Sequence, residues 1–129
     1  MTPAVLDASA ILAHLKDEPG ADAVKAHLPG AIISAVNVAE IGTKLVDHGI
    51  SEHDMLAAIG ELGLNVVAFD ERAALAVAAL RTRTRRLGLS LGDRACLALG
   101  VARGLPVLTA DRNWAGLDLG IEIRLIRGP

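Results

Sequence analysis

The chain has 129 residues, of which 52% are hydrophobic and only 2% aromatic, so it is too apolar to be disordered and its core must be aliphatic. The single cysteine, Cys96, excludes an internal disulfide, and the formal net charge of −2 argues against a generic basic nucleic-acid binder. No apolar run approaches the ~18 residues of a membrane span and no secretory leader is recognisable, so we expect a cytoplasmic protein with no membrane partner.

Strand-like and helical segments alternate along the chain. Apolar runs typical of strands fall at residues 3–6, 31–34, 65–69, 106–109 and 121–126. Helical periodicity, capping residues and Gly or Pro stops predict helices at residues 9–18, 21–28, 36–48, 51–62, 71–86 and 90–104. This alternation predicts an α/β fold in one domain, residues 1–129, with a parallel five-stranded sheet flanked by helices on both faces.

Two acidic residues stand at the ends of the most apolar strands. Asp7 ends the first strand, and Asp111 closely follows the fourth. Strands that are apolar throughout are typical of the centre of a parallel sheet, covered on both faces. Since ligands of open α/β sheets bind at the carboxyl ends of the strands, we expect Asp7 and Asp111 at the functional edge.

Two further acids lie in helical segments that are otherwise largely apolar, namely Glu40 and Asp93. Carboxylates are costly to bury unless they are paired, hydrogen-bonded or bound to metal. Four of them brought together would repel one another and raise at least one pKa. Mg²⁺ or Mn²⁺ would relieve that repulsion, and such an ion can activate water for phosphodiester hydrolysis.

Each acid taken alone also has a structural explanation. Asp7 and Asp111 could each cap the turn that follows. Ser90 and Asp93 have the spacing of a helix capping box, and Glu40 could be a partly exposed helix residue. It is the joint arrangement of four acids that favours a functional site.

Four segments in order carry a resemblance to a known family: Val5-Leu-Asp-Ala-Ser9, Ile33-Ser-Ala-Val-Asn-Val-Ala-Glu40, Leu89-Ser-Leu-Gly-Asp-Arg-Ala-Cys-Leu-Ala-Leu-Gly100 and Leu105-Pro-Val-Leu-Thr-Ala-Asp-Arg-Asn-Trp114. With these motifs and spacings, nearly the whole chain resembles the PIN-domain ribonucleases, and within them the VapC toxins of type II toxin–antitoxin (VapBC) modules. The resemblance implies a PIN-like three-layer α/β/α fold.

The resemblance also implies an activity, which is Mg²⁺- or Mn²⁺-dependent cleavage of RNA, with transfer RNA or ribosomal RNA as the substrate. The residues matching the family's catalytic and metal-binding acids are Asp7, Glu40, Asp93 and Asp111. Ser9 and Thr109 match hydroxyl residues that support the site. Asn113 stands where many relatives carry another Asp, and Asn37, where many carry Ser or Thr, is interpreted as a helix N-cap.

The partners implied by the resemblance are a VapB-type antitoxin that blocks the acidic pocket, a second copy of the toxin in a homodimer, and RNA. The candidates for RNA contact are arginines. Arg94 and Arg112 each directly follow a site acid, and Arg81 and Arg85 belong to a basic helix end. Contact with RNA phosphate competes here with surface salt bridges and with a solvated helix end that complements the helix dipole.

Two other hypotheses compete with that of a toxin. One is a catalytically inactive PIN-like scaffold that acts as a protein- or RNA-binding module, although the presence of all four acids counts against it. The other is a phosphotransfer domain. A dehalogenase-like phosphatase would need a second Asp where Ser9 stands, and a receiver-like domain would need a late lysine, whereas the last lysine here is Lys44.

Overall fold

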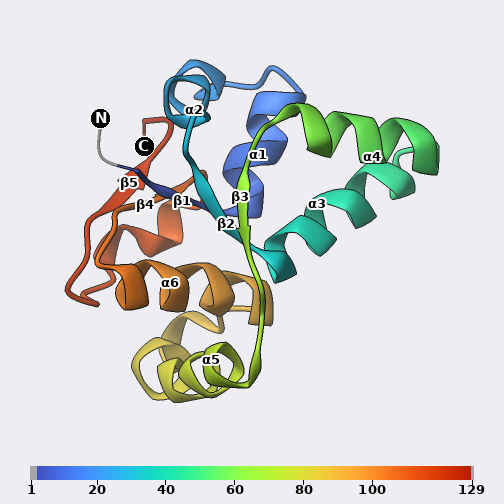
Figure 1. Ribbon diagram of the computed structural model, residues 1–129. Helices are drawn as coiled ribbons and strands as arrows, with labels where there is room; N and C mark the ends of the chain where they lie inside the picture. The colour runs from blue at the N-terminus through green and yellow to red at the C-terminus, as the bar shows by residue number, and fades with distance from the viewer. Residues whose placement is uncertain (1–2, 129) are drawn as a thin grey trace.

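Five short strands form one sheet in the computed structural model, which describes residues 3–128 (Figure 1). The strands are β1 (Val5–Leu6), β2 (Ile32–Ser34), β3 (Asn65–Val67), β4 (Val107–Thr109) and β5 (Ile123–Leu125). Their order across the sheet is β3-β2-β1-β4-β5, and every neighbouring pair is parallel. The predicted parallel five-stranded sheet is confirmed, and its two most apolar strands, β1 and β4, are interior strands.

Six α-helices connect the strands, and all were predicted to within a few residues. They are α1 (Ala8–Leu15), α2 (Ala21–His27), α3 (Ala35–Asp47), α4 (Glu52–Glu61), α5 (Glu71–Thr84) and α6 (Leu91–Arg103). Two 3-10 helices, η1 (Arg85–Leu87) and η2 (Arg112–Gly116), follow α5 and β4. No helix within residues 3–128 is long and apolar enough to cross a membrane.

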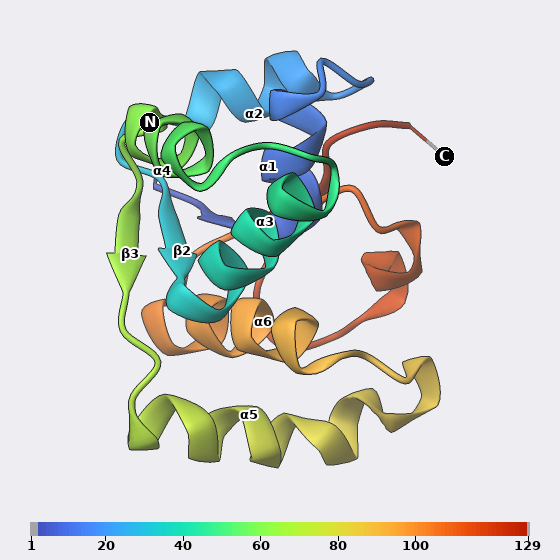
Figure 2. The same ribbon diagram turned by 90° about the vertical axis from the view of Figure 1, so that its right-hand side faces the viewer.

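The helices form a layer on each face of the sheet, which confirms the three-layer α/β/α architecture (Figure 2). Successive β-strand side chains point to opposite faces. Leu6 and Leu108 therefore join a core with α1, α2 and α3, whereas Val5 and Val107 join a second core with α5 and α6. Both cores are aliphatic apart from the fully buried Trp114 and the partly buried Phe69, as the composition predicts.

Polar side chains set where the helices begin. The hydroxyl of Ser34 accepts the N–H of Val36 at the start of α3, and Asp70 caps α5 in the same way. The N-cap of α3 is thus Ser34 and not Asn37, which lies one turn into the helix; that prediction is wrong. Asp7 occupies the N-cap position of α1, but its side chain makes no capping hydrogen bond, so its carboxylate is available for other contacts.

Candidate active site

The carboxylate of Asp7 is held by two hydroxyl groups at the carboxyl edge of the sheet. Asp7 follows β1 directly and is only 4% exposed. Its Oδ2 accepts a hydrogen bond of 2.6 Å from Ser9 Oγ and one of 2.9 Å from Thr109 Oγ1. Each hydroxyl has one proton, and both donate to the same oxygen. Ser9 and Thr109 therefore lie beside Asp7, as the resemblance implies.

Backbone N–H groups fix the direction of both hydroxyls. Ser9 Oγ accepts from the N–H of Ala110 at 3.0 Å, and Thr109 Oγ1 accepts from the N–H of Asp111 at 3.0 Å. Because the backbone groups can only donate, the hydroxyls are left to donate to Asp7. The backbone of the turn after β4 therefore orients two hydroxyl donors, one from α1 and one from β4, toward the Asp7 carboxylate.

Burial nevertheless makes the ionised form of Asp7 costly. The pKa of Asp7 is raised from 3.8 to about 6, with desolvation as the largest cause. The hydrogen bonds from Ser9 and Thr109 oppose this rise, and the negative charges of Asp93 and Glu40 add to it. Three of the four predicted acids therefore lie within electrostatic range of one another, in a site that favours a proton or another cation.

Glu40 is held on α3 by a buried amide. Asn37 is fully buried, and its Nδ2 donates to Glu40 Oε1 at 2.8 Å and to the carbonyl of Gly92 at 3.0 Å. Gly92 lies directly against the Glu40 carboxylate, so a Cβ atom there would overlap it. This contact joins α3 to the first turn of α6, one residue before Asp93.

Asp93 and Asp111 have the capping contacts that the sequence left open. Asp93 Oδ2 accepts from the N–H of Ser90 at 3.1 Å, and Ser90 Oγ accepts from the N–H of Asp93, which completes a capping box. Asp111 Oδ1 accepts from the N–H of Asn113 at 2.9 Å at the start of η2. Asn113 itself is exposed. One carboxylate oxygen of each Asp is engaged in these contacts.

The donor chemistry of the site suits a hard divalent cation, although the carboxylates do not form a closed cage. Within residues 3–128, no three His, Cys, Asp or Glu side chains lie close enough together to hold a metal ion. No Lys or Arg of these residues forms an ion pair with the four acids. Mg²⁺ commonly binds one or two carboxylates and keeps several waters. A buried, unneutralised carboxylate with two acids nearby fits such an ion.

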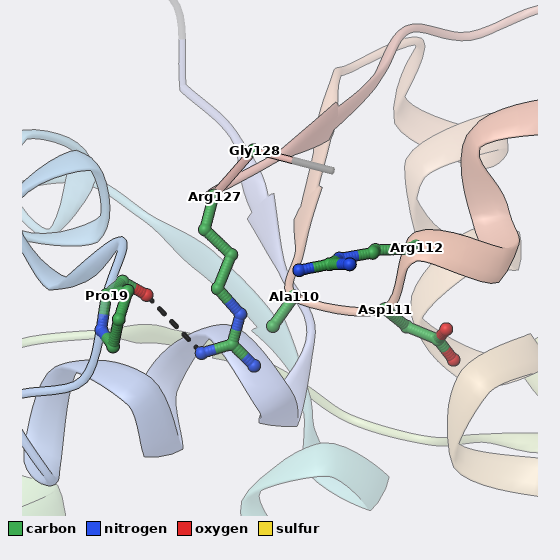
Figure 3. A pocket seen from close by; sticks show the side chains of 6 residues that line it. All are labelled: Pro19, Ala110, Asp111, Arg112, Arg127 and Gly128. Atoms are coloured by element: carbon green, nitrogen blue, oxygen red, sulfur yellow. Dashed lines mark hydrogen bonds between the residues drawn. The ribbon is translucent and has the colours of Figure 1, made fainter.

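The arginines named from the sequence lie in different places. Arg94 is half-buried and donates to the carbonyl of Val77 in α5 at 3.1 Å, so it contributes to the packing of α5 on α6. Arg81 and Arg85 are exposed on α5 and η1, in the layer outside α6. Arg112 is exposed and lines a pocket that Asp111 also lines (Figure 3).

Sequence reasoning missed two residues that shape the site. Gly92 allows the Glu40 carboxylate to approach α6, and the only signal for it is a glycine beside a site acid. Arg127 lines the pocket beside Asp111, and nothing in the local sequence links these two positions.

Comparison with known proteins identifies the family. Residues 4–119 match the model of the PIN domain, so the chain belongs to the PIN domain family, as its motifs indicated. A sequence comparison with curated proteins finds no match.

Solved structures share the fold at low sequence identity. A toxin–antitoxin complex from Klebsiella pneumoniae matches with a TM-score of 0.74 and 20% identity over 98% of this chain and 99% of that one. DNA-bound VapBC from Salmonella typhimurium gives a TM-score of 0.74, 20% identity and the same two coverages, 98% and 99%. VapBC-1 from nontypeable Haemophilus influenzae gives a TM-score of 0.73 and 17% identity over 96% and 98%.

Proposed function

We propose that this protein is a VapC-type toxin, a Mg²⁺- or Mn²⁺-dependent endoribonuclease whose activity an antitoxin blocks. The observation that carries the proposal is the Asp7 carboxylate. It is buried, held by Ser9 and Thr109, and placed within electrostatic range of Glu40 and Asp93. Membership of the PIN family and the toxin–antitoxin complexes among the structural neighbours support it.

The site residues have different roles in the proposed reaction. Asp7, Glu40, Asp93 and Asp111 would hold the metal, directly or through water. When bound, the ion supplies positive charge and an activated water. Ser9 and Thr109 keep Asp7 Oδ2 oriented, which leaves its second oxygen for the ion. Asn37 and Gly92 set the position of Glu40.

An RNA cleavage assay tests the activity. The purified protein should cleave transfer or ribosomal RNA with Mg²⁺ or Mn²⁺ and should lose cleavage in chelator. Asp7→Asn and Asp93→Asn should each abolish it. Asparagine can still accept the N–H of Ser90, so the second variant removes charge and keeps the helix cap.

Asp54 offers a matched control for Asp93. Its N–H donates to the N-cap Ser51 at the start of α4, as that of Asp93 donates to Ser90. Asp54→Asn should therefore cleave at the wild-type rate. Equal activity of the Asp93 and Asp54 variants, or full activity in chelator, would refute the proposal.

A second candidate is a PIN-like scaffold that binds partners without catalysis. It is favoured by the local hydrogen bonds of Glu40, Asp93 and Asp111, each of which a purely structural residue could make. Calorimetric titration with Mn²⁺ separates the two. Binding that Asp7→Asn abolishes supports the nuclease, and the absence of binding above a non-specific background supports the scaffold.

The antitoxin and the homodimer form part of the same proposal. The groove between α3 and α4 exposes apolar side chains, including Leu56, which is 61% exposed. Exposed apolar surface of this kind is typical of interaction sites. Co-expression with a cognate antitoxin should relieve toxicity and yield a complex. Light scattering of the free toxin should give the mass of a dimer.

A further inference from the structure

A second feature of the carboxyl edge is a shallow pocket on the side of Asp111 that faces away from its carboxylate. The pocket has a volume of about 700 Å³, and its lining residues are Pro19, Ala110, Asp111, Arg112, Arg127 and Gly128. Figure 3 shows the Arg112 side chain extending over Ala110 toward Arg127, while the Asp111 carboxylate points to the other side of the backbone. Two guanidinium groups thus approach one depression with no carboxylate between them.

The two arginines differ in how they are held. Arg127 Nη1 donates to the carbonyl of Pro19 at 3.4 Å and lies 3.9 Å from Glu18 Oε1 (Figure 3). Arg112 makes no side-chain hydrogen bond and no ion pair within residues 3–128. One guanidinium is therefore partly anchored and partly neutralised, and the other keeps its full charge and all its donors for a ligand.

The pocket adjoins the proposed active site through the backbone. Ala110 lines the pocket, and its N–H donates to Ser9 Oγ, which in turn donates to Asp7. Ala110 is also the residue between Thr109 and Asp111 in the chain. An anion between Arg112 and Arg127 would therefore lie close to the proposed active site. The acids on one side of this turn suit a cation, and the arginines on the other side suit an anion.

We infer that Arg112 and Arg127 together bind one phosphodiester of the RNA strand, next to the phosphate that is cleaved. This inference rests on the proposed function for the identity of the strand. Guanidinium groups bind phosphate by charge-assisted, often bidentate hydrogen bonds. No aromatic side chain lines the pocket, so it offers no surface on which a base could stack. The pair holds the strand in register by its backbone, without reading sequence.

Salt-dependent RNA binding tests the inference. The protein carries Asp7→Asn and is kept in chelator, so that cleavage is blocked and KCl supplies the only competing cations. A fluorescein-labelled single-stranded RNA reports affinity by anisotropy as the KCl concentration rises. Each phosphate contact on a single strand contributes about 0.7 to the slope of log affinity against log salt.

Arg112→Ala and Arg127→Ala should each weaken binding by about tenfold, as expected for a lost charged hydrogen bond, and should lower the slope by less than the ~0.7 of one full phosphate contact, because the remaining arginine still neutralises the same phosphate. The double variant should lose that contact entirely and lower the slope by about 0.7. Arg72→Ala is the matched control, since Arg72 is exposed at the distant start of α5. It should leave affinity and slope unchanged.

Three results would overturn the inference: no RNA binding by the Asp7→Asn protein, arginine variants that behave like the Arg72 control, or variants that lose only antitoxin affinity. Arg112 is exposed, so its variant cannot fail merely through misfolding. Cleavage by the otherwise wild-type protein decides the proposed function separately. There, Arg112→Ala should raise KM and retain kcat. RNA binding that follows the predicted pattern without any cleavage would support the phosphate site and refute the proposed nuclease activity.

Discussion

Thr109 Oγ1 lies 2.9 Å from Asp7 Oδ2 and accepts the N–H of Asp111 with its free lone pair. One hydroxyl thereby joins the acid that ends β1 to the acid that follows β4, across two neighbouring parallel strands. Hydrogen bonds to a carboxylate favour its charged form. The hydroxyl thus opposes the effect of burial on Asp7 and aligns the edge of the sheet at the same time.

Thr109→Val should shift the pH dependence of cleavage toward alkaline pH. Valine keeps the shape but removes a hydrogen bond that lowers the pKa of Asp7, so the pKa should rise further above about 6. Activity at pH 6 should fall more than activity at pH 8. The N–H of Asp111 also loses its acceptor, which should cost about 1–3 kcal/mol of stability.

A control for this variant is Thr84→Val. Thr84 is a buried threonine that donates to the carbonyl of Leu80 at 2.9 Å, away from the site. Its substitution should change stability and leave the pH profile of cleavage in place. A Thr109 variant with a wild-type profile would contradict the proposed role of the hydroxyl.

Asp7→Asn should stabilise the metal-free protein at neutral pH. The pKa of Asp7 is raised from 3.8 to about 6 on folding, so the folded state binds the proton more tightly than the unfolded state. The contribution of Asp7 to the free energy of unfolding is fully present below pH 4 and is lost as pH rises through about 6. About two pKa units correspond to a loss of about 3 kcal/mol.

The measurement is urea unfolding of both proteins in chelator across this pH range. Asparagine does not titrate, and its Oδ1 can still accept from Ser9 and Thr109. The difference in unfolding free energy should therefore be small at pH 4 and should favour the variant at pH 7.5. A difference that stays constant with pH would show that the Asp7 pKa is not raised.

Gly92→Ala should leave a folded protein with little activity. The new Cβ would overlap the Glu40 carboxylate, which can move away by giving up its hydrogen bond from Asn37, at a cost of about 1–3 kcal/mol. Displacing a site carboxylate by an ångström can cost about a hundredfold in rate. Gly60→Ala is the control, because Gly60 is also helical and a Cβ there meets no atom within 4 Å. It should retain full activity and gain about 0.5–1 kcal/mol of stability. Equal activities of the two variants would rule out a positioning role for Gly92.

The fold was largely predictable because its signals are local. Short apolar runs predicted the strands, and capping serines such as Ser90 predicted the helix starts. Asn37 shows the limit of such signals. It resembles an N-cap, but Ser34 takes that role and frees the Asn37 amide to reach Glu40 and Gly92.

The geometry of the site was less predictable, since it depends on contacts between distant segments. The order of the four acids could be predicted from the sequence, but the role of each acid could not. The same residue can cap a helix and belong to the site, as Asp93 illustrates. The approach of Arg127 to Pro19 joins positions 108 residues apart. Neither position carries a local signal for that contact.

Mn²⁺ should raise the melting temperature of the wild-type protein, and more at pH 7.5 than at pH 5. An ion that binds only the folded state stabilises it by about 2.7 kcal/mol at a hundred times its Kd. At pH 5 it must displace the proton that Asp7 holds with a pKa of about 6, whereas at pH 7.5 the carboxylate is already free. Asp7→Asn should abolish the shift at both pH values, and Asp54→Asn should preserve it. Since both variants remove one negative charge, a shift that survives in the Asp7 variant would mean that the ion binds elsewhere on the acidic surface.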